Sequence, residues 1–536
     1  MIRIRNTIRR ASACVRLVGP RRDFRPILGR TAARERTMRR SLTVAALIVF
    51  GLSGCASLAK CKQSCAADAP PVPEQPEAIT QPLDRLSHYD AYPKRDETFG
   101  TPLDYHQLAI APRLLVESLD GGNRHRDLNL SIPIYVVGIE KVIGQSEGHF
   151  GSEDDSRKAR KQCIGRDFQV DVLKRDDPDT ERAEKSYDAA CQSMNDRRPM
   201  LLTHIVRSDG IAAGLLQAPC NLFSVYRDQH GCGVAGAVES PASTRYDYSA
   251  AVAAVDALRS QVTQAASTHR PTHLLLLSTG WNTHQDESLY NYLDWLQRLQ
   301  DASDGRFRPL VVAITWQSAW DRWPPLASAL TKGNDADEIG LTWANRVLND
   351  VLLPAATETA TPVVMIGHSY GTRVLGAALF DRRVIKRDKD IAASGEVPLT
   401  FIALQPAFPL QRFGEGGEPL FYGATSLPVL TVMTASKHDH ANSGLDRFWG
   451  AYAGGGASLK RAASKDKDGL PKGIAANTVD ETGRFEQTLP RSGFYLTDAS
   501  AIVDCAMPNT GGGAHSAVYS KEIGRLMWQA IQASTR

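Results

Sequence analysis

Short apolar runs alternate with helical stretches along the chain from about residue 200 onward. The clearest runs are 274–277, 310–315 and 363–366, and each is followed by a segment in which apolar residues recur every three to four positions. Runs of this length without polar alternation are typical of parallel strands whose two faces are both buried. The pattern therefore predicts an α/β fold with a doubly wound, mostly parallel sheet.

Other segments extend this pattern. Further strands are predicted at LLTHIV, NLFSVYR, PLTFIALQP, PVLTVMTAS and FYLTDASAIVDCA, and further helices at 248–266, YNYLDWLQRLQ, 343–353 and after residue 515. We expect one domain over 201–536, with a flexible insertion at 446–483 that is rich in Gly, Lys and Ala. Residues 101–200 combine apolar runs with a charged stretch, which indicates an accessory region or an elaborated start of the sheet.

A targeting signal precedes the globular part. The segment MRRSLTVAALIVFGLSGC (38–55) has a basic start, an apolar run of signal-peptide length and small residues before Cys55. Its end resembles the lipobox of bacterial lipoproteins, which implies cleavage before Cys55, acylation of that residue and anchoring without a transmembrane helix. Ala56 in the next position suggests the outer membrane, facing the periplasm. An ordinary cleaved signal or a short anchor is the alternative.

Composition separates the leader from the mature chain. Residues 1–37 are a basic leader or a mis-assigned start upstream of Met38, and 55–100 is a lipidated, Pro-rich tether. The whole chain has 63 Lys and Arg against 59 Asp and Glu, but 13 Arg and only two acids lie in 1–54, so the remainder carries a net charge of −7. A mildly acidic mature chain argues against a nucleic-acid partner.

Export to an oxidising compartment makes the cysteines disulfide candidates. Seven remain once the leader and lipidated cysteines are set aside, and one of the seven must stay unpaired within the chain. Bonds are expected between sequence neighbours, as Cys163–Cys191 and Cys220–Cys232. Cys61 and Cys65 have no second ligand pair nearby, which disfavours a metal site there. The sequence indicates no cofactor.

The strand at 363–366 runs through GHSYG (367–371) directly into a helix. A bare GxSxG is weak evidence, but here Gly367 and Gly371 flank the serine and let strand and helix approach closely around a strained turn. In this context the segment resembles the nucleophile elbow of the α/β-hydrolase superfamily, and the resemblance extends over about 200–536. An inert serine in a glycine-rich turn is the alternative.

The resemblance implies a catalytic triad in the family's chain order of serine, acid and histidine. Ser369 would be the nucleophile, Asp439 after the strand PVLTVMTAS the acid, and His515 in the glycine loop after the last strand the base. A serine hydroxyl is a poor nucleophile, so it needs the imidazole to take its proton and the carboxylate to orient the imidazole. Asp498 and Asp504 are rival candidates for the acid.

Two backbone N–H groups are expected to form an oxyanion hole, those of Tyr370 and Trp281. The second belongs to GWN (280–282), which resembles the family's HGxN-type loop, although Thr279 replaces the histidine. The Trp-rich segment 316–330 lies at the predicted sheet edge. It would either wall an acyl pocket or plug the core.

Together these features predict a membrane-anchored serine hydrolase of the carboxylesterase or lipase type. It would cleave a small-molecule or lipid ester through an acyl-enzyme on Ser369. Two other functions remain open, because the same scaffold also carries proteins that hydrolyse nothing. One is a non-catalytic binding or structural envelope lipoprotein, and the other is an acyltransferase that passes the acyl group to an alcohol.

Overall fold

The computed structural model describes residues 125–141, 200–224, 231–233, 248–283, 285–318, 329–380, 397–414, 421, 424, 427–443, 451–464, 469–504 and 513–536. All of them lie in the larger of two units, Lys62–Arg536. The predicted leader, signal peptide and tether lie outside the described residues, and so do Cys55, Cys163 and Cys191.

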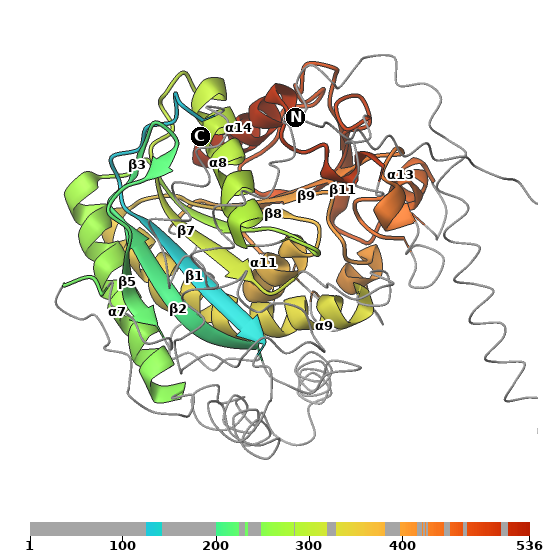
Figure 1. Cartoon of the computed structure of the whole chain (residues 1–536). Coiled ribbons are helices and arrows are strands. Elements are labelled where there is room, and N and C mark those ends of the chain that lie inside the picture. Colours follow the sequence, from blue (N-terminus) through green and yellow to red (C-terminus); the bar gives the residue numbers. More distant parts are fainter. Residues whose placement is uncertain are drawn as a thin grey trace, which may run out of the picture. The chain divides into compact units, whose positions relative to one another are not determined.

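A ten-stranded, mostly parallel sheet runs through the described part of the chain (Figure 1). Its spatial order is β11 (Ile474–Thr478), β12 (Gly493–Asp498), β10 (Leu430–Ala435), β9 (Leu399–Leu404), β8 (Val363–His368), β6 (His273–Ser278), β7 (Pro309–Trp316), β1 (Ile134–Lys141), β2 (Met200–Ser208) and β5 (Cys220–Ser224). The strands from β11 to β1 are parallel, and β2 and β5 are antiparallel to their neighbours. The predicted α/β class is confirmed.

Helices cover both faces of the sheet and close two hydrophobic cores. On β6, Leu274 and Leu276 belong to one core and Leu275 and Leu277 to the other, which explains the uninterrupted apolar run. One core is closed by α8 (Gln285–Ala302) and α14 (Lys521–Thr535), which lie next to each other in Figure 1. The other is closed by α7 (Tyr248–His269), α9 (Ala329–Ile339), η5 (Gly340–Ala344), η6 (Val347–Leu352), α10 (Leu353–Thr359) and α11 (Gly371–Phe380).

The structure bears on two predictions about domain organisation. Of the two alternatives for 101–200, the described residues fit an elaborated start of the sheet, because β1 pairs with β7 and β2 inside the main sheet. The segment 446–483 is not simply a flexible insertion, because it contains α13 (Gly456–Ala463) and the edge strand β11. Its small residues serve close packing: a Cβ on Gly454 would lie 2.4 Å from Asn442 Nδ2. Glycine content alone therefore misled the prediction.

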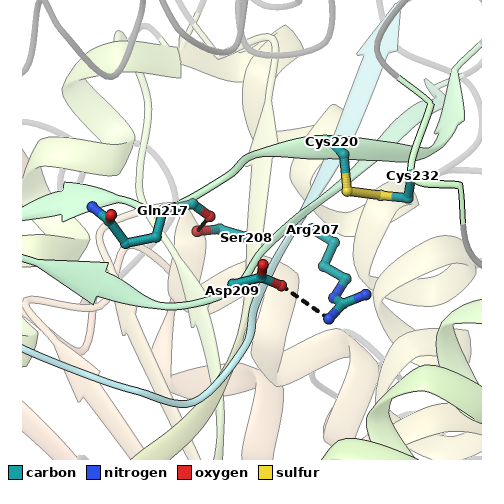
Figure 2. The surroundings of a disulfide bond; sticks show 6 residues. All are labelled: Arg207, Ser208, Asp209, Gln217, Cys220 and Cys232. Carbon is teal, nitrogen blue, oxygen red and sulfur yellow. Dashed lines mark hydrogen bonds and ion pairs between the residues drawn. A yellow bond between two sulfur atoms is a disulfide. The ribbon is translucent and has the colours of Figure 1, made fainter.

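A disulfide joins Cys220 on the outer strand β5 to Cys232, as predicted (Figure 2). The backbone N–H of Cys232 also donates to the carbonyl of Asn221, so Cys232 is fastened to the edge strand at two points. Closing a loop of this size contributes on the order of 3 kcal/mol by chain entropy. Arg207 pairs with Asp209 at 2.9 Å, and Figure 2 shows this contact as a dashed line close to the disulfide.

A buried ion cluster joins three segments around the start of α11. Both guanidinium groups, of Arg373 in α11 and Arg412 in η8 (Leu410–Phe413), contact both carboxylate oxygens of Asp337 in α9. The bonds from Arg412 measure 2.9 and 2.8 Å. Burial alone would raise the pKa of Asp337, but the two guanidinium groups reverse this and lower it to about 2. The cluster thus fixes α11 against α9 and the segment after β9.

We expect Asp337→Asn to lower the free energy of unfolding by about 3 to 5 kcal/mol, because it leaves two buried guanidinium groups without their counter-charge. Urea unfolding at neutral pH measures this. Because the pKa of Asp337 is lower in the folded state, its stabilisation is present above the unfolded pKa of about 3.9 and is lost as pH falls towards 2.

The matched control is Asp209→Asn, which breaks the ion pair with Arg207. The side chain of Asp209 is 58% exposed, so we expect a loss below about 1 kcal/mol. Equal small losses in the two variants would show that the buried cluster does not hold α11 in place.

Candidate active site

Ser369 occupies a strained corner between β8 and α11. Its φ of +53° lies in the left-handed region that non-glycine residues rarely adopt. The corner has no room for side chains at its two glycines. A Cβ on Gly371 would lie 2.1 Å from the carbonyl oxygen of Ser278, and one on Gly367 would lie 3.0 Å from the backbone of Gly371. The sequence GxSxG is therefore what allows this corner to form.

The loop after β6 touches the same corner. A Cβ on Gly280 would lie 2.5 Å from the Cβ and 3.0 Å from the Oγ of Ser369. Ser318, just after β7, holds the loop: its carbonyl accepts from the N–H of Asn282 at 3.1 Å and its Oγ from the N–H of Thr283 at 3.0 Å. Because β7, β6 and β8 are adjacent and parallel, their carboxyl ends bring these loops together.

Thr279, which replaces the histidine of the HGxN-type pattern, has its own buried partners. Its hydroxyl donates to Ser288 Oγ at 2.8 Å, and its backbone N–H donates to the Tyr292 hydroxyl at 3.0 Å. Trp316 Nε1 donates to the backbone carbonyl of Thr279 at 3.0 Å. Side chains from α8 and β7 thus fix the start of this loop without a histidine.

Tyr370 and Trp281 are the residues whose backbone N–H groups are predicted to form the oxyanion hole. Each directly follows one of the two residues that meet at the corner, Ser369 and Gly280. The Tyr370 ring is buried, and the Arg373 guanidinium lies 5.3 Å from its centre. The Trp281 side chain is half-buried against the core. Within the Trp-rich segment, Trp316 is a core residue, whereas 319–328 lies outside the described residues.

Asp439 follows β10 and is fully buried. Its Oδ1 accepts from the backbone N–H of Asn442 at 2.9 Å. Its Oδ2 accepts from Asn442 Nδ2 at 2.9 Å, Gln405 Nε2 at 3.1 Å and His515 Nδ1 at 2.8 Å. Gln405 itself has φ +45° at the end of β9. Asn442, three residues further on, thus satisfies Oδ1, while Asn442, Gln405 and His515 satisfy Oδ2.

His515 lies in the short helix η11 (Ala514–Ser516), which is fastened to the loop that carries Asp439. The N–H of Ala514 donates to the carbonyl of His438 at 3.1 Å, and Gly513 forms a β-bridge with Asp439. Gly513 has φ +66°, and a Cβ on it would lie 2.8 Å from the His438 carbonyl oxygen. Because a carboxylate only accepts, the bond to Asp439 places a proton on His515 Nδ1.

The structure therefore brings Asp439 and His515 together, and His515 contacts His368, the residue before Ser369. Of the rival acids, Asp498 accepts from the backbone N–H of Ser500 at 2.9 Å and Asp504 is exposed. The bond from His515 Nδ1 goes to Asp439.

Sequence reasoning missed the partners that hold these residues. Gln405 ends a predicted strand and Asn442 follows the acid by three positions, but neither carries a motif. His368 was visible inside GHSYG, although its contact was not: its Nε2 lies 3.0 Å from the carbonyl oxygen of His515. Burial, and then the electrostatic effect of the neighbouring His515 ring, lower the pKa of His368 to about 3, so the His368 ring is neutral at ordinary pH.

No protein-family model, curated protein or solved structure matches this chain. Among the residues that the structure describes, no group of three or more His, Cys, Asp or Glu side chains could hold a metal ion. Within the same residues, no helix is both long enough and apolar enough to cross a membrane.

We expect Gly371→Ala to destabilise the protein by about 1 to 3 kcal/mol, because the new methyl would collide with the backbone of β6, which cannot move away cheaply. Thermal and urea unfolding measure the change. Gly233→Ala is the control, since a Cβ there meets nothing within 4 Å. A Gly371→Ala variant as stable as Gly233→Ala would show that the corner is looser than described.

Proposed function

We propose that this chain is a membrane-anchored serine hydrolase that cleaves carboxylic esters through an acyl-enzyme on Ser369. The observation that carries the proposal is the 2.8 Å bond between His515 Nδ1 and the buried Asp439 Oδ2. His515 also contacts His368, which precedes the strained Ser369. A serine on a sharp strand-to-helix turn, with a histidine oriented by a buried carboxylate, is the arrangement that activates a hydroxyl for acyl transfer.

The topology supports a doubly wound sheet of α/β-hydrolase type. The chain runs from β6 outward to β7 and then returns past β6 to β8, so the strand order reverses at β6. In open α/β sheets, ligands bind at such a reversal, outside the carboxyl ends of the strands. Ser369 and Gly280 meet at this place, with β1, β2 and β5 extending one side of the sheet.

In the proposed reaction, Ser369 Oγ attacks the ester carbonyl while His515 Nε2 takes its proton. Asp439 keeps the Nδ1 proton in place and stabilises the imidazolium. The tetrahedral oxyanion would accept from the backbone N–H groups of Tyr370 and Trp281, and each such donor is worth about 10² to 10³ in rate. The ester C–O bond then breaks, and the alcohol leaves with the proton from His515. Water, activated by the same histidine, releases the acid.

We expect Ser369→Ala and His515→Ala each to abolish fluorophosphonate labelling and hydrolysis of short p-nitrophenyl esters, because the triad acts as a unit. Asp439→Asn should lower kcat by about 10⁴, since the amide no longer holds the correct tautomer. Asp504→Asn is the matched control, because its exposed carboxyl should leave kcat within about twofold of the wild type.

Three outcomes would change the proposal. A loss in Asp504→Asn with Asp439→Asn unaffected would move the acid to the segment that follows β12. A folded wild-type protein that is inert to the probe and to an ester library would favour a binding or structural lipoprotein. Acylated alcohol as the main product when water and an alcohol compete would make the protein an acyltransferase.

The proposed anchor is a lipid on Cys55, which would hold the enzyme at the bacterial outer membrane facing the periplasm. We expect Cys55→Ala to abolish incorporation of a labelled fatty acid and to release the protein from the membrane fraction, because the substitution removes the thiol that carries the lipid. Cys61→Ala is the matched control and should keep the label. A Cys55→Ala variant that still carries labelled fatty acid would contradict the lipoprotein assignment.

A further inference from the structure

The loop that carries His515 is held at three described points. The His515 side chain bonds to Asp439, the N–H of Ala514 donates to the His438 carbonyl, and the His515 carbonyl accepts from His368. The first two contacts tie the loop to the residues after β10. The third ties it to the corner that carries the nucleophile, because His368 immediately precedes Ser369 on β8.

The bond from His368 has a defined direction. A backbone carbonyl can only accept, so His368 carries its proton on Nε2, which lies 3.0 Å from the His515 oxygen. The two rings are also packed together, with their centres 4.9 Å apart, and the ring of Tyr519 lies 6.4 Å from that of His368. Only 7% of the His368 surface is exposed. The donor is therefore shielded from water, which would otherwise compete for the carbonyl.

The protonation state of His368 suits this contact. Burial and the neighbouring His515 lower the pKa of His368 to about 3, so the His368 ring stays neutral near pH 7. A charged ring packed against that of His515 would oppose the imidazolium that forms during attack. A neutral imidazole donates the same hydrogen bond without that repulsion.

We propose that His368 is a positioning residue that sets the distance between the base and the nucleophile. This inference rests on the proposed function. The bond from Asp439 fixes one point on the His515 ring but leaves the ring able to move relative to Ser369. The bond from His368 connects the backbone of the base directly to the corner of the nucleophile, so both groups keep their relative place when either loop moves.

The test compares His368→Leu, which removes the donor, with His368→Gln, whose amide nitrogen can take the position of Nε2. Stopped-flow burst amplitude with a p-nitrophenyl ester counts the functional sites, so kcat is expressed per functional site. We expect His368→Leu to lower kcat and the fluorophosphonate labelling rate by about 10- to 100-fold, the effect of misplacing a catalytic group by about 1 Å. KM should stay within about twofold, and His368→Gln should recover most of kcat.

His273→Leu is the matched control. His273 is also 7% exposed, is packed against the aromatic rings of Phe307 and Trp528, and has its pKa lowered by burial to about 4, but it lies at the opposite end of β6. We expect its loss to lower the melting temperature without changing kcat per functional site. If His368 had a purely structural role, His368→Leu would behave in the same way. The number of functional sites would fall, but kcat per functional site would stay at the wild-type value.

The outcomes separate this proposal from the proposed function. An inert wild-type protein would overturn both. An active wild type with His368→Leu within twofold of its kcat per site would overturn the positioning role alone. If His368→Leu does not fold, His368→Gln and His368→Asn decide, because the shorter Asn side chain keeps an amide but cannot reach the carbonyl. A lower kcat for Asn than for Gln supports the proposal, and equal values overturn it.

Discussion

The close contact between Gly280 and Ser369 is the constraint on which the site depends. These residues follow two neighbouring parallel strands, β6 and β8, so their backbones meet at one edge of the sheet. A Cβ on Gly280 would lie 2.5 Å from that of Ser369, which itself adopts φ +53°. A left-handed backbone at a non-glycine residue costs about 1 to 3 kcal/mol, which the surrounding fold must offset. The sheet, buried on both faces, keeps this contact in place.

Buried polar bonds extend that rigidity on both sides of the corner. One turn after Ser369, Arg373 is locked to Asp337 in α9. One residue before it, His368 donates to the carbonyl of His515. These groups are shielded from water, so a broken bond would leave a buried polar atom unpaired at a cost of about 1 to 3 kcal/mol. Stability and the proposed chemistry thus depend on the same contacts.

The sequence predicted the parallel strands well, because a strand covered on both faces leaves an uninterrupted apolar run such as 274–277. It missed β11 (IAANT), because an edge strand with two exposed alanines has no such run. In the site, chain order and the family resemblance pointed to Ser369, Asp439 and His515. Asp498 and Asp504 were rival acids, and it is Asp439 that the structure brings to the His515 ring. The contacts of His368 and Gln405 span 147 and 34 residues, so no local pattern predicts them.

The most direct test of the proposed site is a crystal structure of the purified protein after reaction with a fluorophosphonate. We expect the phosphorus atom on Ser369 Oγ. Its anionic oxygen should lie about 2.7 to 3.1 Å from the backbone nitrogens of both Tyr370 and Trp281, where an oxyanion hole must place its donors. A phosphonate attached to another residue, or one on Ser369 with its oxygen turned away from both nitrogens, would contradict the proposed mechanism.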